Sequence, residues 1–142
     1  MMKWLIATTS IIGALNSASL ACRANQSMDT VTAHYFPFDH ETFIPITMDS
    51  IEERARCKFT LNRLSPEVSM IEKLVETMGR GEFDATVVRL KVSGLLEGDL
   101  YVDVDGGILI SHPRREGSSE GASFDDLKAT FVSLAQKEGC GD

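Results

Sequence analysis

The stretch RCKFTLNRLSPEVSMIEKLVETMG, residues 56–79, contains a strand pattern followed directly by a helix pattern. Over residues 56–62 apolar and polar side chains alternate, which is typical of a strand with one buried face. Ser65 and Pro66 then provide an N-cap and a first helical residue, because a serine oxygen accepts a bond from a free N–H and proline has none to satisfy. Gly79 marks the expected end of the helix. The apolar residues between them have helical spacing: Val68, Ile71, Leu74, Val75 and Met78.

Two further strand segments follow the predicted helix. In TVVRLKV, residues 86–92, the apolar side chains at alternate positions are expected to face the helices, namely Val88, Leu90 and Val92. In DLYVDVDGGILI, residues 99–110, an Asp-Gly-Gly run separates two apolar segments. Glycine readily adopts the positive φ of tight hairpin turns, so this run predicts a hairpin.

The segments on either side of this region have weaker patterns. Residues 31–46 are rich in β-branched and aromatic side chains but contain Pro37 and Pro45. Proline cannot donate a hydrogen bond to a sheet ladder, so the segment is predicted to form edge strands or an extended arm. Residues 111–122, SHPRREGSSEGA, are predicted to form a loop.

A second helix is predicted near the C-terminus. Ser123 is the expected cap, with Asp126 three residues later in a capping-box arrangement. The apolar stripe consists of Phe124, Leu127, Phe131 and Leu134. The order β-α-β-β-β-α predicts an α+β fold with a small antiparallel sheet of about four strands and two amphipathic helices on one face.

The N-terminus has the pattern of a secretory signal peptide. A basic residue near the start is followed by an apolar stretch that is too short for a membrane span of roughly 20 apolar residues. Small residues Ser19 and Ala21 precede the predicted cut after Ala21. We therefore expect a signal peptide over residues 1–21, a flexible lead-in over 22–30, and a single domain over 31–142. No transmembrane segment is predicted.

Cys22 directly follows this cut, so its fate bears on disulfide pairing. A lipoprotein signal is also cut before a cysteine, and a lipid anchor at Cys22 is the alternative; a cut after Ala24 would remove the residue. Export implies an oxidising compartment, and without Cys22 the remaining pair is Cys57 and Cys140. A bridge between them closes a loop of about 80 residues, worth about 4 kcal/mol in the chain-entropy model. We predict this bridge, with two unpaired thiols as the alternative.

The chain is acidic, with a formal net charge of −7 from 14 Lys+Arg and 21 Asp+Glu. Proteins that bind nucleic-acid backbones use clustered cations, so no nucleic-acid partner is predicted. An acidic protein attracts a cationic partner, although acidity also serves solubility alone.

No pattern of residues forms a recognisable catalytic or metal site. The four possible ligands in residues 34–43 fit no known metal spacing: His34, Asp39, His40 and Glu41. A calcium loop starting at Asp103 would need Glu at its twelfth position, where Arg114 stands. A GxSxG motif is absent, and only carboxylates far apart in sequence could still form a catalytic pair. The sequence therefore predicts a protein without cofactor or catalytic activity.

Two groups of residues are predicted to bind a protein partner. On the sheet face opposite the helices, strand parity gathers Arg56, Lys58, Arg89 and Lys91, with Tyr101 on the next strand. Cross-strand ion pairing is the alternative role for these cations. The loop over residues 111–122 adds His112, Arg114 and Arg115, unless it is a flexible connector.

Export, acidity, one disulfide-linked domain and the lack of a catalytic pattern together favour a binding protein. We expect a small periplasmic inhibitor or immunity protein that blocks a toxin or hydrolase acting in the cell envelope. Lipid anchoring at Cys22 or full secretion are the alternatives for its location. The alternative function is that of an accessory or chaperone subunit in an envelope secretion or adhesion system.

Overall fold

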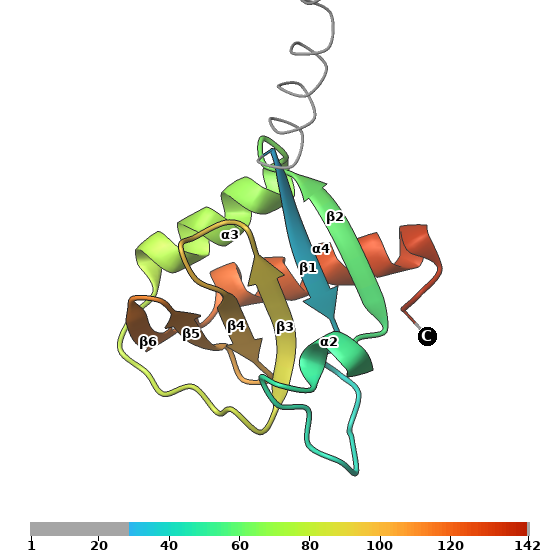
Figure 1. Cartoon of the computed structure of the whole chain (residues 1–142), viewed down its shortest axis with the longest axis horizontal. Coiled ribbons are helices and arrows are strands. Elements are labelled where there is room, and N and C mark those ends of the chain that lie inside the picture. Colours follow the sequence, from blue (N-terminus) through green and yellow to red (C-terminus); the bar gives the residue numbers. More distant parts are fainter. Residues whose placement is uncertain (1–28, 142) are drawn as a thin grey trace, which may run out of the picture.

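The computed structural model describes residues 29–141, which form an antiparallel sheet with helices on both faces (Figure 1). The elements in chain order are β1 (Thr30–Tyr35), α2 (Ile51–Arg54), β2 (Cys57–Asn62), α3 (Pro66–Thr77), β3 (Val88–Ser93), β4 (Leu100–Asp103), β5 (Gly107–Ser111), β6 (Arg114–Ser118) and α4 (Ala122–Glu138). The predicted signal peptide and Cys22 lie outside the described residues. Within residues 29–141, no helix has the length and apolar character that crossing a membrane requires.

The fold is α+β, as predicted, but the sheet has 6 strands rather than about four, in the order β2-β1-β3-β4-β5-β6. The four predicted strands correspond to β2, β3, β4 and β5. The two additional strands, β1 and β6, come from the segments predicted to be an arm and a loop.

Strand β1 lies inside the sheet, between β2 and β3. Ala33, for example, pairs with Phe59 on one side and with Val92 on the other. The prediction of edge strands or an arm for residues 31–46 was wrong for this part, because β1 ends at Tyr35, before Pro37. Proline therefore terminates the strand without interrupting its ladder.

Strand β6 forms a hairpin with β5 through a turn at His112–Pro113, whose peptide bond is cis. The prediction of a loop over residues 111–122 was wrong for Arg114–Ser118. This edge strand has polar or small side chains and lacks the alternation of a half-buried strand. Its pairing with β5, together with a bridge between Ser118 and Gly79, defines it instead.

Helices α3 and α4 cover one face of the sheet and form the main core, as predicted. Ser65 caps α3 by accepting a bond from the N–H of Val68. Gly121 rather than Ser123 caps α4, since its positive φ of 67° suits glycine. The core joins apolar side chains of both helices to those of the sheet, including Val31, Phe59, Leu90, Ile71, Leu74, Leu127 and Phe131.

The predicted disulfide between Cys57 and Cys140 is confirmed. It links the first residue of β2 to the segment just after α4. The bridge therefore fastens the C-terminal helix to an edge strand, and it closes a loop with a sequence separation of 83.

The predicted β4–β5 hairpin is present and is organised by the buried carboxylate of Asp103. Its Oδ1 accepts bonds from the N–H groups of Asp105 and Gly107, at 2.9 and 2.8 Å. Its Oδ2 accepts a third bond from the N–H of Asp84, at 2.8 Å. Asp103 thus accepts hydrogen bonds from two donors of the hairpin turn and from one donor between α3 and β3.

A third, short helix, α2, lies against the opposite face of the sheet with the segment that follows β1 (Figure 1). They cover a second apolar cluster: Phe36, Ile46, Ile51, Val88, Tyr101 and Leu109. Val88 was predicted to face α3 and α4 and does not, because a β-bulge between Val88 and Leu90 changes the alternation of β3. The face predicted to be open is therefore partly a core.

Candidate functional site

The predicted partner-binding residues lie at two separate places on the sheet. His112, Arg114 and Arg115 are exposed on the β5–β6 hairpin, next to Gly98 in the β3–β4 connection. The cations of β2 and β3 lie on the face that α2 partly covers. The structure therefore does not unite them into one surface.

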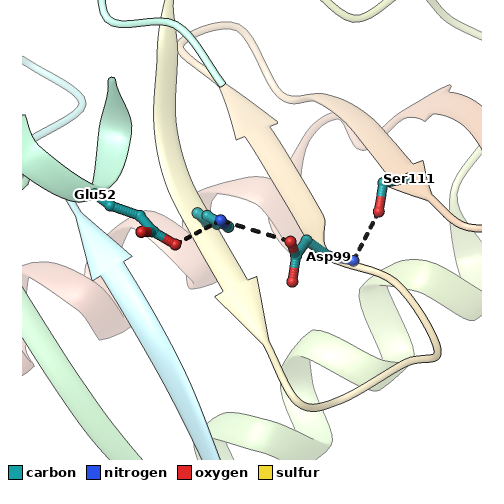
Figure 2. A network of polar contacts seen from close by, with 4 residues as sticks. Glu52, Asp99 and Ser111 are labelled. Carbon is teal, nitrogen blue, oxygen red and sulfur yellow. Dashed lines mark hydrogen bonds and ion pairs between the residues drawn. The ribbon is translucent and has the colours of Figure 1, made fainter. Parts of the chain in front are cut away.

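Lys91 is neutralised by acids of its own chain (Figure 2). Its Nζ lies 2.6 Å from Oε1 of Glu52 and 3.5 Å from Oδ2 of Asp99. The N–H of Asp99 donates to Oγ of Ser111, at 2.8 Å, which fixes one of these acids. Burial alone would lower the pKa of Lys91, but the bond to Glu52 and the neighbouring negative groups raise it above its ordinary value. The ammonium is thus committed to an internal network.

Tyr101 and Lys58 flank this network in different environments. Tyr101 is buried, and its ring lies 5.6 Å from Nζ of Lys91. Burial raises the pKa of the Tyr101 hydroxyl. Lys58 is exposed on the edge strand β2, opposite His34 of β1, which in turn pairs with Lys91. Of the two lysines, only Lys58 has an exposed ammonium group.

The loop after β1, residues 36–46, carries two exposed large apolar side chains, one of which is the most exposed within residues 29–141, and we call it the Phe43 loop. Phe43 is 108% exposed and Ile44 is 67% exposed. Arg54 of α2 holds the backbone beneath them, since its Nη1 donates to the carbonyls of Ile44 and Pro45, at 2.8 and 2.7 Å. The loop lies below α2 at the lower edge of Figure 1.

Arg89 supports the same loop from within the protein. Arg89 was predicted to lie on an open surface, and this prediction was wrong. The residue is only 4% exposed because the Phe43 loop covers it. Its Nη2 donates to the carbonyl of His40, at 3.1 Å, and its Nη1 to that of Val88, at 3.2 Å. Its Nε has no hydrogen-bond partner. Burial lowers the pKa of Arg89, and the charge of Arg54 lowers it further.

Arg56, the residue before β2, is exposed and lies against the same aromatic ring as the buried Arg89. Its guanidinium carbon lies 5.3 Å from the centre of the Phe36 ring, and that of Arg89 lies 5.4 Å from the same ring. Strand pairing explains this arrangement: the N–H of Arg56 bonds to Tyr35 and the N–H of Phe36 bonds to Arg89. We call Arg54, Arg56 and Arg89 the arginine cluster.

A cavity of about 340 Å³ lies beside the Phe43 loop, between residues that follow β1 and the C-terminal end of α4. Its lining residues are Tyr35, Pro37, Asp39, His40, Val132, Ala135, Gln136, Gly139 and Gly141. Burial, followed by the charge of Asp39, raises the pKa of Tyr35. The cavity thus adds a recess with a mixed polar and apolar lining next to the exposed loop.

The four possible metal ligands of residues 34–43 are not brought together. His34 points to the Lys58–Lys91 row, whereas Asp39 and His40 line the cavity. No group of three or more His, Cys, Asp or Glu side chains within residues 29–141 is placed to hold a metal ion.

Sequence reasoning did not predict the exposure of Phe43 and Ile44. The available signal was an apolar pair, followed by Pro45, in a segment where proline prevents a continuous strand. Such side chains have no strand face on which to be buried. No protein-family model, curated protein or solved structure matches the chain, so its site rests on this geometry.

Proposed function

We propose that this is an exported binding protein that inhibits a toxin or hydrolase of the cell envelope by inserting the Phe43 loop into a cleft of its partner. The observation that carries the proposal is the full exposure of Phe43 on a loop whose carbonyls are held by two arginines. The protein acts by occupation and performs no chemistry of its own.

The energetic argument starts from the exposed side chain. Burying a Phe side chain is worth about 1.5–3 kcal/mol, and this gain is unused in the free protein. Aromatic anchors that fill a partner's pocket dominate the affinity of many interfaces. Phe43, with Ile44 beside it, is suited to this role.

The supporting structure lowers the entropic cost of binding. Three carbonyls of the loop accept bonds from arginines: those of His40, Ile44 and Pro45. A loop held in its bound conformation loses less freedom on association. Single exposed apolar residues are common on proteins, but an adjacent pair on a fastened loop favours a docking role.

Capture from an envelope extract of the native host, with three forms of the full chain, tests the proposal. The forms are the wild type, Phe43→Ser and the matched control Leu64→Ser. Leu64 is 91% exposed and lies in the β2–α3 turn, away from the Phe43 loop. Neither substitution removes a buried contact, so both variants should fold like the wild type.

The wild type and Leu64→Ser are expected to retain the same toxin or hydrolase and to inhibit it after purification. Phe43→Ser should bind it at least about 30-fold more weakly, which corresponds to about 2 kcal/mol. Equal binding by Phe43→Ser, or a captured protein whose activity is unaffected, would reject the proposal. Recovery of secretion or adhesion components would favour the accessory function instead.

A further inference from the structure

The arginine cluster has positive charges that no ion pair with the described part of the chain neutralises. Within residues 29–141, no Asp or Glu side chain lies within 4.0 Å of Arg54, Arg56 or Arg89. This is unexpected in a chain with a net charge of −7. Lys91, on the same sheet face, differs from these arginines because it forms ion pairs with Glu52 and Asp99.

Arg89 makes the lack of counter-charge most evident. A buried charge is normally paired, because its removal from water costs several kcal/mol. Arg89 is 4% exposed, its two hydrogen bonds go to neutral carbonyls, and its Nε is unpaired. Such an arrangement leaves the positive field of the buried guanidinium uncompensated.

Arg56 is the member of the cluster that a ligand can reach. It is exposed, and its guanidinium lies against Phe36, as does that of Arg89. A guanidinium packed on a ring keeps its N–H groups available at its edge, where a carboxylate can accept two of them. Arg54, at the end of α2, adds its charge close to Arg89.

We propose that the arginine cluster is a carboxylate-binding site, in which Arg56 contacts the ligand while Arg54 and the buried Arg89 add positive field. Building on the proposed function, its occupant is a carboxylate side chain of the protein partner. The partner then presents acidic residues next to the apolar cleft that accepts Phe43.

A protein carboxylate suits the site better than a polyanion. Arg54 also holds the exposed Phe43 loop, so a partner that binds both features has an apolar surface next to its carboxylate. The net charge of −7 repels a densely charged polyanion such as nucleic acid. A single carboxylate instead interacts mainly with the nearby positive charges of the arginine cluster. Asp39 and Glu41 lie in the loop itself but form no ion pair with these arginines.

A first experiment tests the site without the partner, with citrate as a carboxylate probe. Arginine Nε–H NMR signals of the full chain are followed during titration with citrate at constant ionic strength. The signals of Arg54 and Arg56 should shift in a saturable manner, whereas those of Arg114 and Arg115 on the distant hairpin should not. Non-saturable shifts, or equal shifts at all four arginines, would overturn the site.

Two variants extend the test to the partner. Arg56→Gln, at an exposed side chain, should weaken citrate binding at least about fivefold and partner binding about tenfold, with reduced sensitivity to salt. Arg80→Gln, at an exposed side chain between α3 and β3, is the matched control and should leave both affinities unchanged. A thermal melt confirms that each variant is folded.

The outcomes separate this inference from the proposed function. If Phe43→Ser loses the partner while Arg56→Gln keeps it, the loop docks but the carboxylate site is refuted. If citrate binds as expected while Phe43→Ser keeps the partner, the anion site stands and the loop-insertion function falls.

Discussion

Replacing Arg89 with methionine tests whether this buried charge serves the fold or a ligand. The substitution removes hydrogen bonds to the carbonyls of His40 and Val88, at 3.1 and 3.2 Å. These are worth about 1.5 kcal/mol each, and the contact with Phe36 adds about 1 kcal/mol, part of which a methionine sulfur retains. The lost stabilisation is therefore about 3–4 kcal/mol.

The same substitution also removes a cost of similar size. Keeping an unpaired cation out of water costs several kcal/mol, here taken as about 3–4. The two totals nearly cancel, so Arg89→Met should change the free energy of unfolding by about 1 kcal/mol or less. It should nevertheless weaken citrate binding, because the field of the cluster falls and the Phe43 loop loses one of its supports.

Asp103→Ala provides the matched comparison, because Asp103 is equally buried at 2% exposure but fully hydrogen-bonded. Its loss removes the acceptor for three backbone donors and leaves the buried N–H of Gly107 unsatisfied. The unsatisfied donor costs about 1–3 kcal/mol, and the loss of the charge-assisted bonds adds to this cost. We therefore expect Asp103→Ala to lower the free energy of unfolding by about 3 kcal/mol or more.

Urea denaturation of the wild type and both variants measures the two changes. A loss of about 3 kcal/mol or more in Arg89→Met, equal to that in Asp103→Ala, would refute the reasoning. It would mean that the Arg89 charge stabilises the fold and requires no external counter-charge. Unchanged citrate binding in a folded Arg89→Met variant would refute its electrostatic role.

Two further predictions concern stability. The double variant Cys57→Ser, Cys140→Ser should lose about 4–5 kcal/mol of unfolding free energy, from the loop of 83 residues that the bridge closes, and a loss below about 1 kcal/mol in urea denaturation would contradict this. Burial lowers the folded-state pKa of His34 below 6.5, an effect that Lys58 and Lys91 reinforce and Glu52 and Asp99 oppose. The unfolded chain therefore binds the proton first, and the folded state loses stability as pH falls from 6.5 toward the folded pKa. His34→Gln should flatten this part of the stability profile, measured as pH falls below 6.5, and identical slopes in the variant and wild type would exclude the effect.

Local patterns predicted the elements that bury one face. Cys57, Phe59 and Leu61 alternate along β2 and face the core, and the spacing of Val68, Ile71 and Leu74 gives α3. The disulfide followed from the number of cysteines and their expected compartment. The strand and the helix were predictable because their patterns lie in neighbouring residues, and the disulfide was predictable because cysteines pair in an oxidising compartment.

The candidate site was only partly predictable, because its residues depend on segments that meet in space. Parity correctly placed Arg56, Lys58 and Lys91 on the face opposite α3 and α4, with Lys91 paired to Glu52 of α2. Parity could not indicate that the Phe43 loop covers Arg89. Nor could composition show that Phe43 would stay outside the second core.

The sequence alone thus determined the α+β class, the four strands with clear alternation, the two long helices and the Cys57–Cys140 pairing. Tertiary structure decided the internal place of β1, the existence of β6, the parity change at Val88 and the burial of Arg89. Periodicity reports only whether one side of an element is apolar. Strand order, a bulge and the packing of a loop over a cation depend on distant partners, and those partners fix the site.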